Sequence, residues 1–459
     1  MSKGLAPGEI VSGILVDGLD GTPYVPASLI YDVESGVRVE VPYLHSPIAD
    51  QFAQCASWFT GNSLPGNLLL LSPEGPISLF ECRPSGHRFA LPSGAAVGKI
   101  RPAYAVMKER DGDLHSPFAV ECFESEIDGA LEWSRMTAIS TVHGVDENGR
   151  LNSFLMEVKS PDVVSWEQGN ATMELHFDWS TSAPKGNFAV TERVVLRSSF
   201  GEGMPPEDHL REHRKVASLL AMCFGYPVVA RRYRVRDSRF TERSLDGTSM
   251  GNPFVDVVVN RAHRDSLQPK PKREDLQLPF SDLQEIKAAG LKQWSDNYDK
   301  WARFILPSVS ALGRRGAVIE NIVVNSCMGL EAAGSIFGFT DGEEVTRQSN
   351  GRETVSTYIF RCIVKSEVDI QGISTCAAGL ARALANNYNT IKHYDRGQFP
   401  DATQTHLLGI ISLIISRAIS VGLARASAFS KVALDEVRSS MAELDLYIND
   451  AGSFVPQPK

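Results

Sequence analysis

The sequence lacks the features of a secreted, zinc-stabilised or membrane-spanning protein. Its seven cysteines are scattered and form no CxxC pair, which argues against structural zinc and against a disulfide framework. The first residues lead into a Pro- and Gly-containing segment without the apolar run of a signal peptide. The longest apolar stretch, residues 407–424, carries Arg417 and several serines and glycines, which predicts a buried helix and no membrane span. We therefore expect a cytoplasmic protein without membrane contact.

An excess of basic charge is also missing. The formal net charge is −9, which excludes broad electrostatic adhesion to nucleic acid, so any RNA contact needs a local basic patch. The sequence has no P-loop, no GxGxxG after a strand and no GxSxG elbow, and we predict neither a metal ion nor a cofactor. With 43% hydrophobic and 22% charged residues, the 459-residue chain has the composition of a globular protein of two or three domains.

Residues 1–200 are dominated by the period-2 alternation that is typical of β-strands. The segments 29–33 and 37–41 alternate around Ser35-Gly36, and this pattern predicts a hairpin. Further strands are expected at 68–71, 77–82, 118–123, 172–179 and 188–196. Many short strands with turns between them predict an antiparallel β-rich region that is similar to a sandwich or a barrel.

Residues 201–263 are predicted to continue this region with mixed structure. Pro205-Pro206 followed by acidic residues indicates the start of a helix, and strands are expected at 228–235 and 254–259. The polar, Pro-interrupted segment 264–279 is predicted to be a linker.

Residues 280–459 are predicted to form an all-α bundle. Trp294, Tyr298 and Trp301 recur at i, i+4 and i+7, which indicates the buried face of a first helix. Further helices are expected at about 317–337, 353–365, 373–391, 402–424 and 427–448. The whole chain is thus predicted to be an α+β multidomain protein, with an antiparallel β-rich N-terminal region and a C-terminal helical bundle.

The fourth of these helices ends in a dense group of polar residues. The segment 385–400 reads ANNYNTIKHYDRGQFP. Asn389 and His393 are spaced at i, i+4 and therefore share a helix face. Arg382 and Asn386 extend the same line toward the helix start, so four polar side chains form one stripe.

This segment resembles the signature of HEPN domains, in which an arginine is followed by a polar residue and, after four to six positions, by a histidine. The tail 392–400 and Gly329-Leu330-Glu331 are similar to the ApeA-like branch of these domains. The segments 8–13 and 118–134, and Asp208-His209-Leu210 with the helix that follows, resemble the ApeA N-terminal region. The likeness covers most of the chain and implies an ApeA-like HEPN protein of anti-phage defence.

The resemblance implies a metal-independent endoribonuclease that cleaves host RNA in abortive infection, with tRNA as a candidate substrate by analogy. The RNA 2′-OH attacks the neighbouring phosphate, which calls for an acid/base and a cation. In this chain the resemblance implies His393 as acid/base, Asn389 as its positioning partner and Arg396 as the catalytic cation. Substrate contacts are expected from Tyr388, Lys392, Arg382 and Asn386. A homodimer through the bundle and a phage-derived trigger bound by the N-terminal region are also implied.

The arginine of the signature is missing from this sequence. Its expected position is held by Tyr388, which can hydrogen-bond a phosphate oxygen but has no positive charge. Arg396 and Lys392 are substitutes close to His393. Arg382 of the same chain lies about 16 Å from His393 along a helix, so only the partner's Arg382 would be a third substitute. Two hypotheses follow: a nuclease, or a catalytically degenerate HEPN module for dimerisation, sensing or RNA binding.

Simpler interpretations exist for each of these residues. A histidine such as His393 is favoured at a helix C-terminus by the helix dipole, and the asparagines are common at helix ends. His209 and His213 are spaced so that they could hold zinc with a third ligand, but we predict a solvated helix face for them. Six arginines between Arg231 and Arg243 are interpreted as a solvated or ion-paired strand edge, with an RNA- or protein-docking edge as the alternative.

Overall fold

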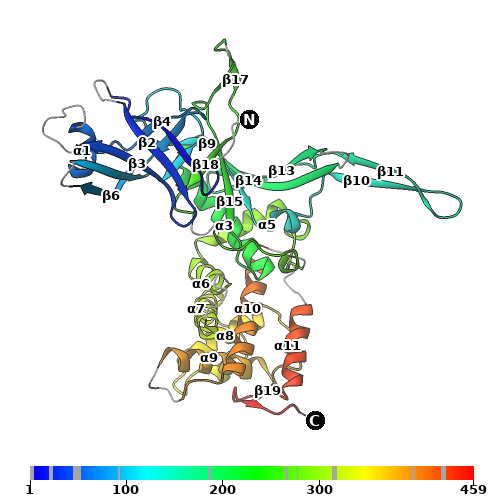
Figure 1. Ribbon diagram of the computed structural model, residues 1–459. Coiled ribbons are helices and arrows are strands. Elements are labelled where there is room, and N and C mark those ends of the chain that lie inside the picture. Colours follow the sequence, from blue (N-terminus) through cyan, green and yellow to red (C-terminus); the bar gives the residue numbers. More distant parts are fainter. Residues whose placement is uncertain are drawn as a thin grey trace.

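A computed structural model describes residues 5–19, 24–44, 53–61, 63–90, 94–183, 188–244, 246–263, 267–276, 278–312, 318–393, 395, 398–424 and 431–458. Figure 1 shows a β-rich N-terminal part that forms a broad crossbar above a stem of helices from the C-terminal part. The predicted fold class, a β-rich N-terminal region followed by a helical bundle, is confirmed.

Fourteen strands of the N-terminal part form one antiparallel sheet. In spatial order its strands are β12 (Val164–Gln168), β13 (Ala171–Ser182), β14 (Ala189–Met204), β9 (Val120–Ile127), β15 (Ala230–Arg236), β18 (Val255–Val259), β8 (Tyr104–Val106), β5 (Ile77–Phe80), β4 (Leu68–Leu71), β1 (Ile10–Val16), β2 (Val25–Asp32), β3 (Gly36–Leu44), β7 (Ala95–Arg101) and β6 (Arg83–Ala90). The predicted hairpin around Ser35-Gly36 is present as β2 and β3, with Leu29 opposite Val39. Gly36 has a φ of +82°, which a residue without a Cβ adopts readily.

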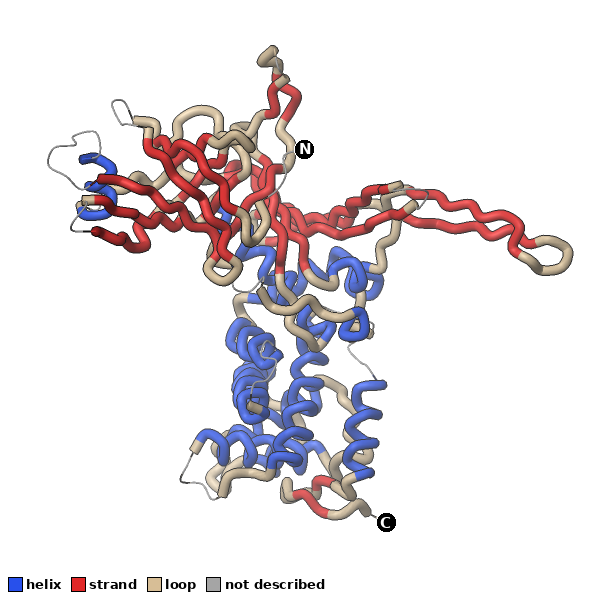
Figure 2. The backbone as a smooth tube through the Cα atoms, in the orientation of Figure 1, coloured by secondary structure: helices blue, strands red, loops and turns tan. Residues whose placement is uncertain are grey.

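A two-stranded ribbon projects from the end of this sheet. Strands β10 (Ile139–Val145) and β11 (Leu151–Val158) pair with each other and form a sheet of their own. Figure 2 shows the ribbon reaching far beyond the rest of the chain, and its apolar side chains Phe154 and Leu155 are 56% and 65% exposed. Two further small sheets are β16 (Glu242–Arg243) with β17 (Ser249–Gly251), and β19 (Tyr447–Ile448) with β20 (Phe454–Val455).

Helices pack against both ends of the large sheet and build the stem. Those of the N-terminal part are α1 (Ala53–Thr60), α2 (Ala130–Ser134), α3 (Pro206–Phe224) and the short η3 (Arg273–Leu276). Those of the stem are α5 (Leu283–Tyr298), α6 (Ala302–Leu312), α7 (Ile319–Phe337), η4 (Glu343–Thr346), α8 (Val355–Lys365), α9 (Ala377–Lys392), α10 (Ala402–Leu423) and α11 (Lys431–Glu443). Trp294, Tyr298 and Trp301 are all buried as predicted, but α5 ends at Tyr298 and Trp301 immediately precedes α6.

One hydrophobic core extends from the sheet into the stem. Residues of β12 to β14, of α2 and α3 and of the stem helices belong to a single cluster. Polar contacts cross the same boundary, since Trp294 Nε1 donates to Lys215 O (2.7 Å) and Arg417 Nε donates to Met222 O (2.9 Å). The division of the chain at residues 200, 263 and 279 stays a prediction.

Helix α10 is the central apolar helix of the stem. Among the described residues it is the one helix long and apolar enough to cross a membrane, and 67% of its most apolar window is buried inside the protein. The hydroxyls of Ser416 and Ser420 donate to carbonyls one turn earlier, which satisfies these polar groups within the core. These observations agree with the buried helix that the sequence predicts.

Candidate functional site

Helix α9 carries the predicted site, and its first turns lie against the C-terminal hairpin. The Cys376 thiol caps the helix start by accepting a hydrogen bond from Gly379 N (3.3 Å). Glycine is required at position 379, because a Cβ there would lie 2.4 Å from Asn449 O of the loop between β19 and β20. The helix ends at Lys392, and His393 has an extended backbone whose N–H still donates to Asn389 O (3.0 Å).

Arg382, Asn386 and Asn389 line one open groove on the surface of the stem. The groove has a volume of about 980 Å³. Its other wall is formed by η4, by the loop that follows it and by the first turns of α8, with Glu331 of α7 at one side. The helical spacing of the sequence therefore brings these three predicted residues together.

Tyr388 and Lys392 lie outside this groove. The Tyr388 ring is only 3% exposed and packs in the core of the stem. Lys392 Nζ donates to Tyr388 OH (3.3 Å) and lies 5.3 Å from the centre of its ring. The side chain at the expected arginine position is thus turned inward and engaged by the neighbouring lysine. Its predicted contact with substrate stays a prediction.

His393 is half-buried at the end of α9. Within the described part of the chain its imidazole makes no hydrogen bond. Arg396, the predicted catalytic cation, lies outside the described residues. The catalytic roles of His393, Asn389 and Arg396 accordingly remain predictions.

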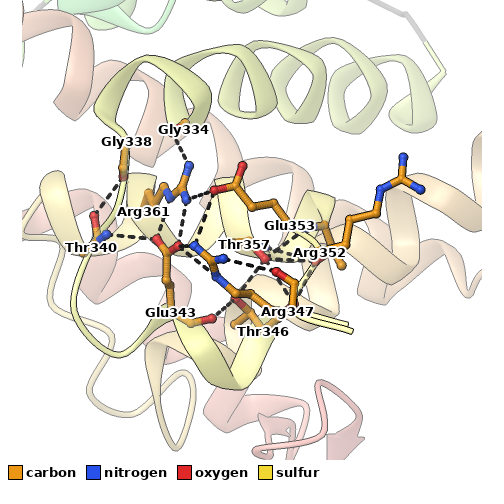
Figure 3. Close-up of polar contacts among 12 residues, drawn as sticks. Gly334, Gly338, Thr340, Glu343, Thr346, Arg347, Arg352, Glu353, Thr357 and Arg361 are labelled. Carbon is orange, nitrogen blue, oxygen red and sulfur yellow. Dashed lines mark hydrogen bonds and ion pairs between the residues drawn. The ribbon is translucent and has the colours of Figure 1, made fainter. Parts of the chain in front are cut away.

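A partly buried cluster of two arginines and two glutamates supports the groove wall (Figure 3). Glu343 is fully buried and accepts from Arg361 at both oxygens, with distances of 2.6 Å and 2.7 Å. Arg347 also donates to Glu343, and Glu353 closes the cluster by pairing with Arg361 and Arg347. Arg361 additionally donates to Gly334 O (3.3 Å) on α7. Two positive and two negative charges therefore balance within the cluster.

Close helix packing makes this cluster possible. A Cβ at Gly334 would lie 2.1 Å from Tyr358 O, so only glycine allows α7 and α8 to approach this closely. The hydrogen bonds from Arg361, with those from Arg347 and the Thr340 N–H, lower the pKa of Glu343 to about 2 although burial raises it. The carboxylate is therefore charged at neutral pH and anchors the loop that forms the groove wall.

Arg382 and Arg352 bring charge to the groove without a carboxylate partner among the described residues. Arg382 donates to the carbonyl oxygens of Val345 and Asp450, which are neutral acceptors. Arg352 is exposed, and in Figure 3 its guanidinium extends away from the cluster. The groove thus combines two arginines, which have no ion-pair partner among the described residues, with the Glu331 carboxylate and two asparagine amides.

Sequence reasoning missed Arg352 and the cluster behind it. Two signals were present: Glu343 and Arg347 stand at i, i+4, and Arg361 is an isolated charge in the apolar segment 358–364. An isolated charge between apolar residues indicates a buried ion pair, because an unpaired charge is costly in a core.

The prediction of a solvated face for His209 and His213 is wrong, because both rings are buried between α3 and the sheet. His209 Nε2 donates to Val120 O (3.1 Å), and the Ser198 hydroxyl donates to His209 Nδ1 (2.8 Å). His213 Nε2 donates to Ser198 Oγ (2.9 Å), and Ser125 donates to His213 Nδ1 (2.6 Å). In this arrangement each of the four ring nitrogens makes one hydrogen bond, both rings are neutral and no ring nitrogen is left for a metal ion.

Burial lowers the pKa of His209 to about 4 and that of His213 to about 3. Both values agree with neutral imidazoles at physiological pH. The pair therefore acts as a structural hydrogen-bond chain that attaches α3 to the sheet.

Five of the six arginines between Arg231 and Arg243 are ion-paired, which agrees with one of the two interpretations. The sixth, Arg236, donates to Cys122 Sγ (3.2 Å). Strand β15 lies between β9 and β18 inside the sheet. The ion pairs are Arg231–Asp128, Arg232–Asp256, Arg234–Glu124, Arg239–Asp237 and Arg243–Asp111. Four of the arginines lie on β15, an interior strand without a free backbone edge, so the predicted strand edge is absent there. Arg243 lies on β16 of a separate two-stranded sheet.

Residues 19–294 match the family model described as ApeA N-terminal domain 1, which is more than half of the chain. The chain belongs to the ApeA family. Membership of the ApeA family indicates a role in anti-phage defence. The match covers most of the β-rich part, α3, the connector and most of α5. Neither a curated protein nor a solved structure matches the chain.

Proposed function

We propose that this ApeA-family protein is an abortive-infection effector whose stem is a HEPN domain that cleaves host RNA without a metal ion. The observation that carries the proposal is the polar stripe of α9. It runs from Arg382, Asn386 and Asn389 in the groove to His393 at the helix end. Such a stripe offers hydrogen bonds to a ribose-phosphate strand and ends in an imidazole, the side chain best suited to proton transfer near neutral pH.

The proposed reaction is transesterification within the RNA strand. The 2′-oxygen attacks the adjacent phosphorus, and the 2′-O–P bond forms while the P–O5′ bond breaks, which leaves a 2′,3′-cyclic phosphate and a 5′-hydroxyl. One imidazole accepts the proton of the 2′-OH and a second donates a proton to the leaving oxygen. One chain supplies a single His393, so the proposal includes a homodimer in which two copies of α9 share the cleft.

Asn389 is the positioning residue in this scheme, and Arg396 supplies the charge that stabilises the transition state. Lys392 is a weaker candidate, because it already donates to Tyr388. The partner's Arg382 is the third candidate for the cation that stabilises the transition state. The further parts of the proposal are a cytoplasmic location, host RNA such as tRNA as substrate, and a phage-derived trigger for the β-rich part.

A second candidate is a HEPN module that binds RNA or a second copy without cleavage. The observation in its favour is the burial of Tyr388, since the position that would carry the arginine presents no cation to a phosphate.

The test is cleavage of RNA by the purified protein, together with bacterial growth and RNA integrity after induced expression. We expect His393→Ala and Arg396→Ala to abolish cleavage and toxicity, and Asn389→Ala to reduce both at least tenfold. His115→Ala, an exposed histidine before β9, is the matched control. Equal activity with and without a chelator is expected. If His393→Ala cleaves RNA as fast as the His115→Ala control, the catalytic role of His393 is refuted. If the wild-type protein cleaves no RNA, the nuclease proposal fails and the binding module remains.

A further inference from the structure

We infer that the groove beside α9 is a phosphate-binding subsite for single-stranded RNA, in which Arg352 and Arg382 hold a backbone phosphate away from the cleaved bond. The choice of RNA as ligand rests on the proposed function. The location of the site is inferred from the charges, the volume and the fixed wall of the groove.

The charge balance of the groove favours an anionic ligand. Its charged lining residues are Glu331, Arg347, Arg352, Glu353 and Arg382. Arg347 and Glu353 are neutralised within the cluster. Arg352 and Arg382 remain against Glu331, which gives a local positive excess in a protein whose formal net charge is −9. This is the local basic patch that an acidic protein needs in order to bind a polyanion.

The wall that carries Arg352 is a rigid support. Arg347 donates to Gly351 O (3.1 Å), next to Arg352, and Glu353 on the other side pairs with the buried Arg361. The residues on both sides of Arg352 are therefore fixed by the cluster in Figure 3, while its guanidinium extends away from that cluster. A cation held in this way loses little backbone freedom when it binds a phosphate.

The groove also fits the rest of a ribose-phosphate unit. Asn386 and Asn389 offer amide donors and acceptors, and the Glu331 carboxylate can accept a hydrogen bond from a ribose 2′-OH. A volume of about 980 Å³ that is open to solvent suits a strand that passes through. At a rise of about 1.5 Å per residue, the stripe from Asn389 to Arg382 lies about 6–16 Å from His393 along the helix. The phosphate held there is therefore one or more nucleotides from the reacting one.

A subsite at this distance contributes to binding in the ground state and in the transition state alike. Loss of Arg352 is therefore expected to raise KM and to leave kcat nearly unchanged. Arg382 is unsuitable for this test, because its removal also frees the carbonyls of Val345 and Asp450.

The experiment measures binding of a short, labelled single-stranded RNA to the full-length His393→Ala protein, which separates binding from cleavage. We expect Arg352→Ala in this background to weaken binding about tenfold and to lower the salt dependence by about one phosphate contact. Arg352→Lys should retain most of the binding. Arg303→Ala removes the same charge from an exposed site on α6 outside the groove and should change binding less than twofold.

Equal effects of Arg352→Ala and Arg303→Ala, or no RNA binding at all, would overturn the inference. Its failure and that of the proposed function are distinguishable. If RNA binding depends on Arg352 but the wild-type protein does not cleave RNA, the inferred subsite is supported and the proposed nuclease function is refuted. If the protein cleaves RNA and Arg352→Ala leaves KM unchanged, the nuclease function is supported and the subsite is refuted.

Discussion

Helices α3 and α9 both carry polar residues at i, i+4 spacing, yet they use them in opposite ways. On α3, His209 and His213 lie under the sheet and their hydrogen bonds go to Ser125, Ser198 and the Val120 carbonyl. On α9, Arg382 and Asn386 line a groove that is open to solvent. The difference comes from what lies over each helix face, since a covered polar group must be hydrogen-bonded within the protein.

The comparison extends to the arginines. Arg231 and Arg234 of β15 are paired with carboxylates inside the sheet region, and Arg361 is paired beneath the groove. Arg352 differs because its side chain lies on the open side of the same cluster. Removing a covered polar group should therefore lower the free energy of unfolding strongly. Removing a polar group of the groove should change the free energy of unfolding little but should weaken binding.

The largest effect is expected from Arg361→Ala. The substitution leaves Glu343 buried without its main partner, and removing one member of a buried ion pair costs about 3–5 kcal/mol. The measurement is the free energy of unfolding in urea, with unfolding monitored by the circular dichroism signal of the helices. Arg352→Ala, with the same loss of charge nearby, should cost below about 0.5 kcal/mol. Equal losses in the two variants would contradict the distinction between covered and open groups.

The next effect concerns pH. In the unfolded chain histidines take up protons below about pH 6.5. In the folded protein His209 does so only near pH 4 and His213 near pH 3. Acid therefore favours the unfolded chain, and stability should fall by about 2 kcal/mol between pH 6.5 and 5.5. Urea unfolding at both values measures this fall, and the double variant His209→Gln/His213→Asn should remove most of it. If the stability of the double variant falls by the same amount between these two pH values, the two buried histidines are not the cause of the fall.

The smallest of these effects is expected from Ser198→Ala. Ser198 joins the two buried histidines, so its loss leaves a buried ring nitrogen without a donor, at a cost of about 1–2 kcal/mol. Asn386→Ala on the exposed face of α9 removes a polar group of similar size and should change stability by no more than about 0.5 kcal/mol. Thermal melting of the two variants side by side checks this, and a larger loss in Asn386→Ala would reverse the comparison.

Local features of the fold were predictable from the sequence. The hairpin of β2 and β3 follows from alternation around Ser35-Gly36, and α7 to α10 follow from their apolar periodicity. The strand order was not predictable, because β9 pairs with β14 and β15, which lie far along the chain. Such distant pairings depend on surfaces that no single segment encodes.

The site shows the same limit. The alignment of Arg382, Asn386 and Asn389 was predictable, because one helix sets their spacing. Arg352 was not, since it reaches the groove from a loop that is placed by the cluster of Glu343 and Arg361. The burial of His209 and His213 was also missed, because α3 is covered by the sheet on one side and by the stem on the other.

The shared core has a consequence for dissecting the protein. Trp133 donates to Ser281 O (3.0 Å), Trp294 to Lys215 O and Arg417 to the end of α3, so each half completes the interior of the other. A chain cut in the connector would leave two fragments, each with aromatic surface exposed to water. We therefore expect the β-rich part and the stem to unfold together as one cooperative unit.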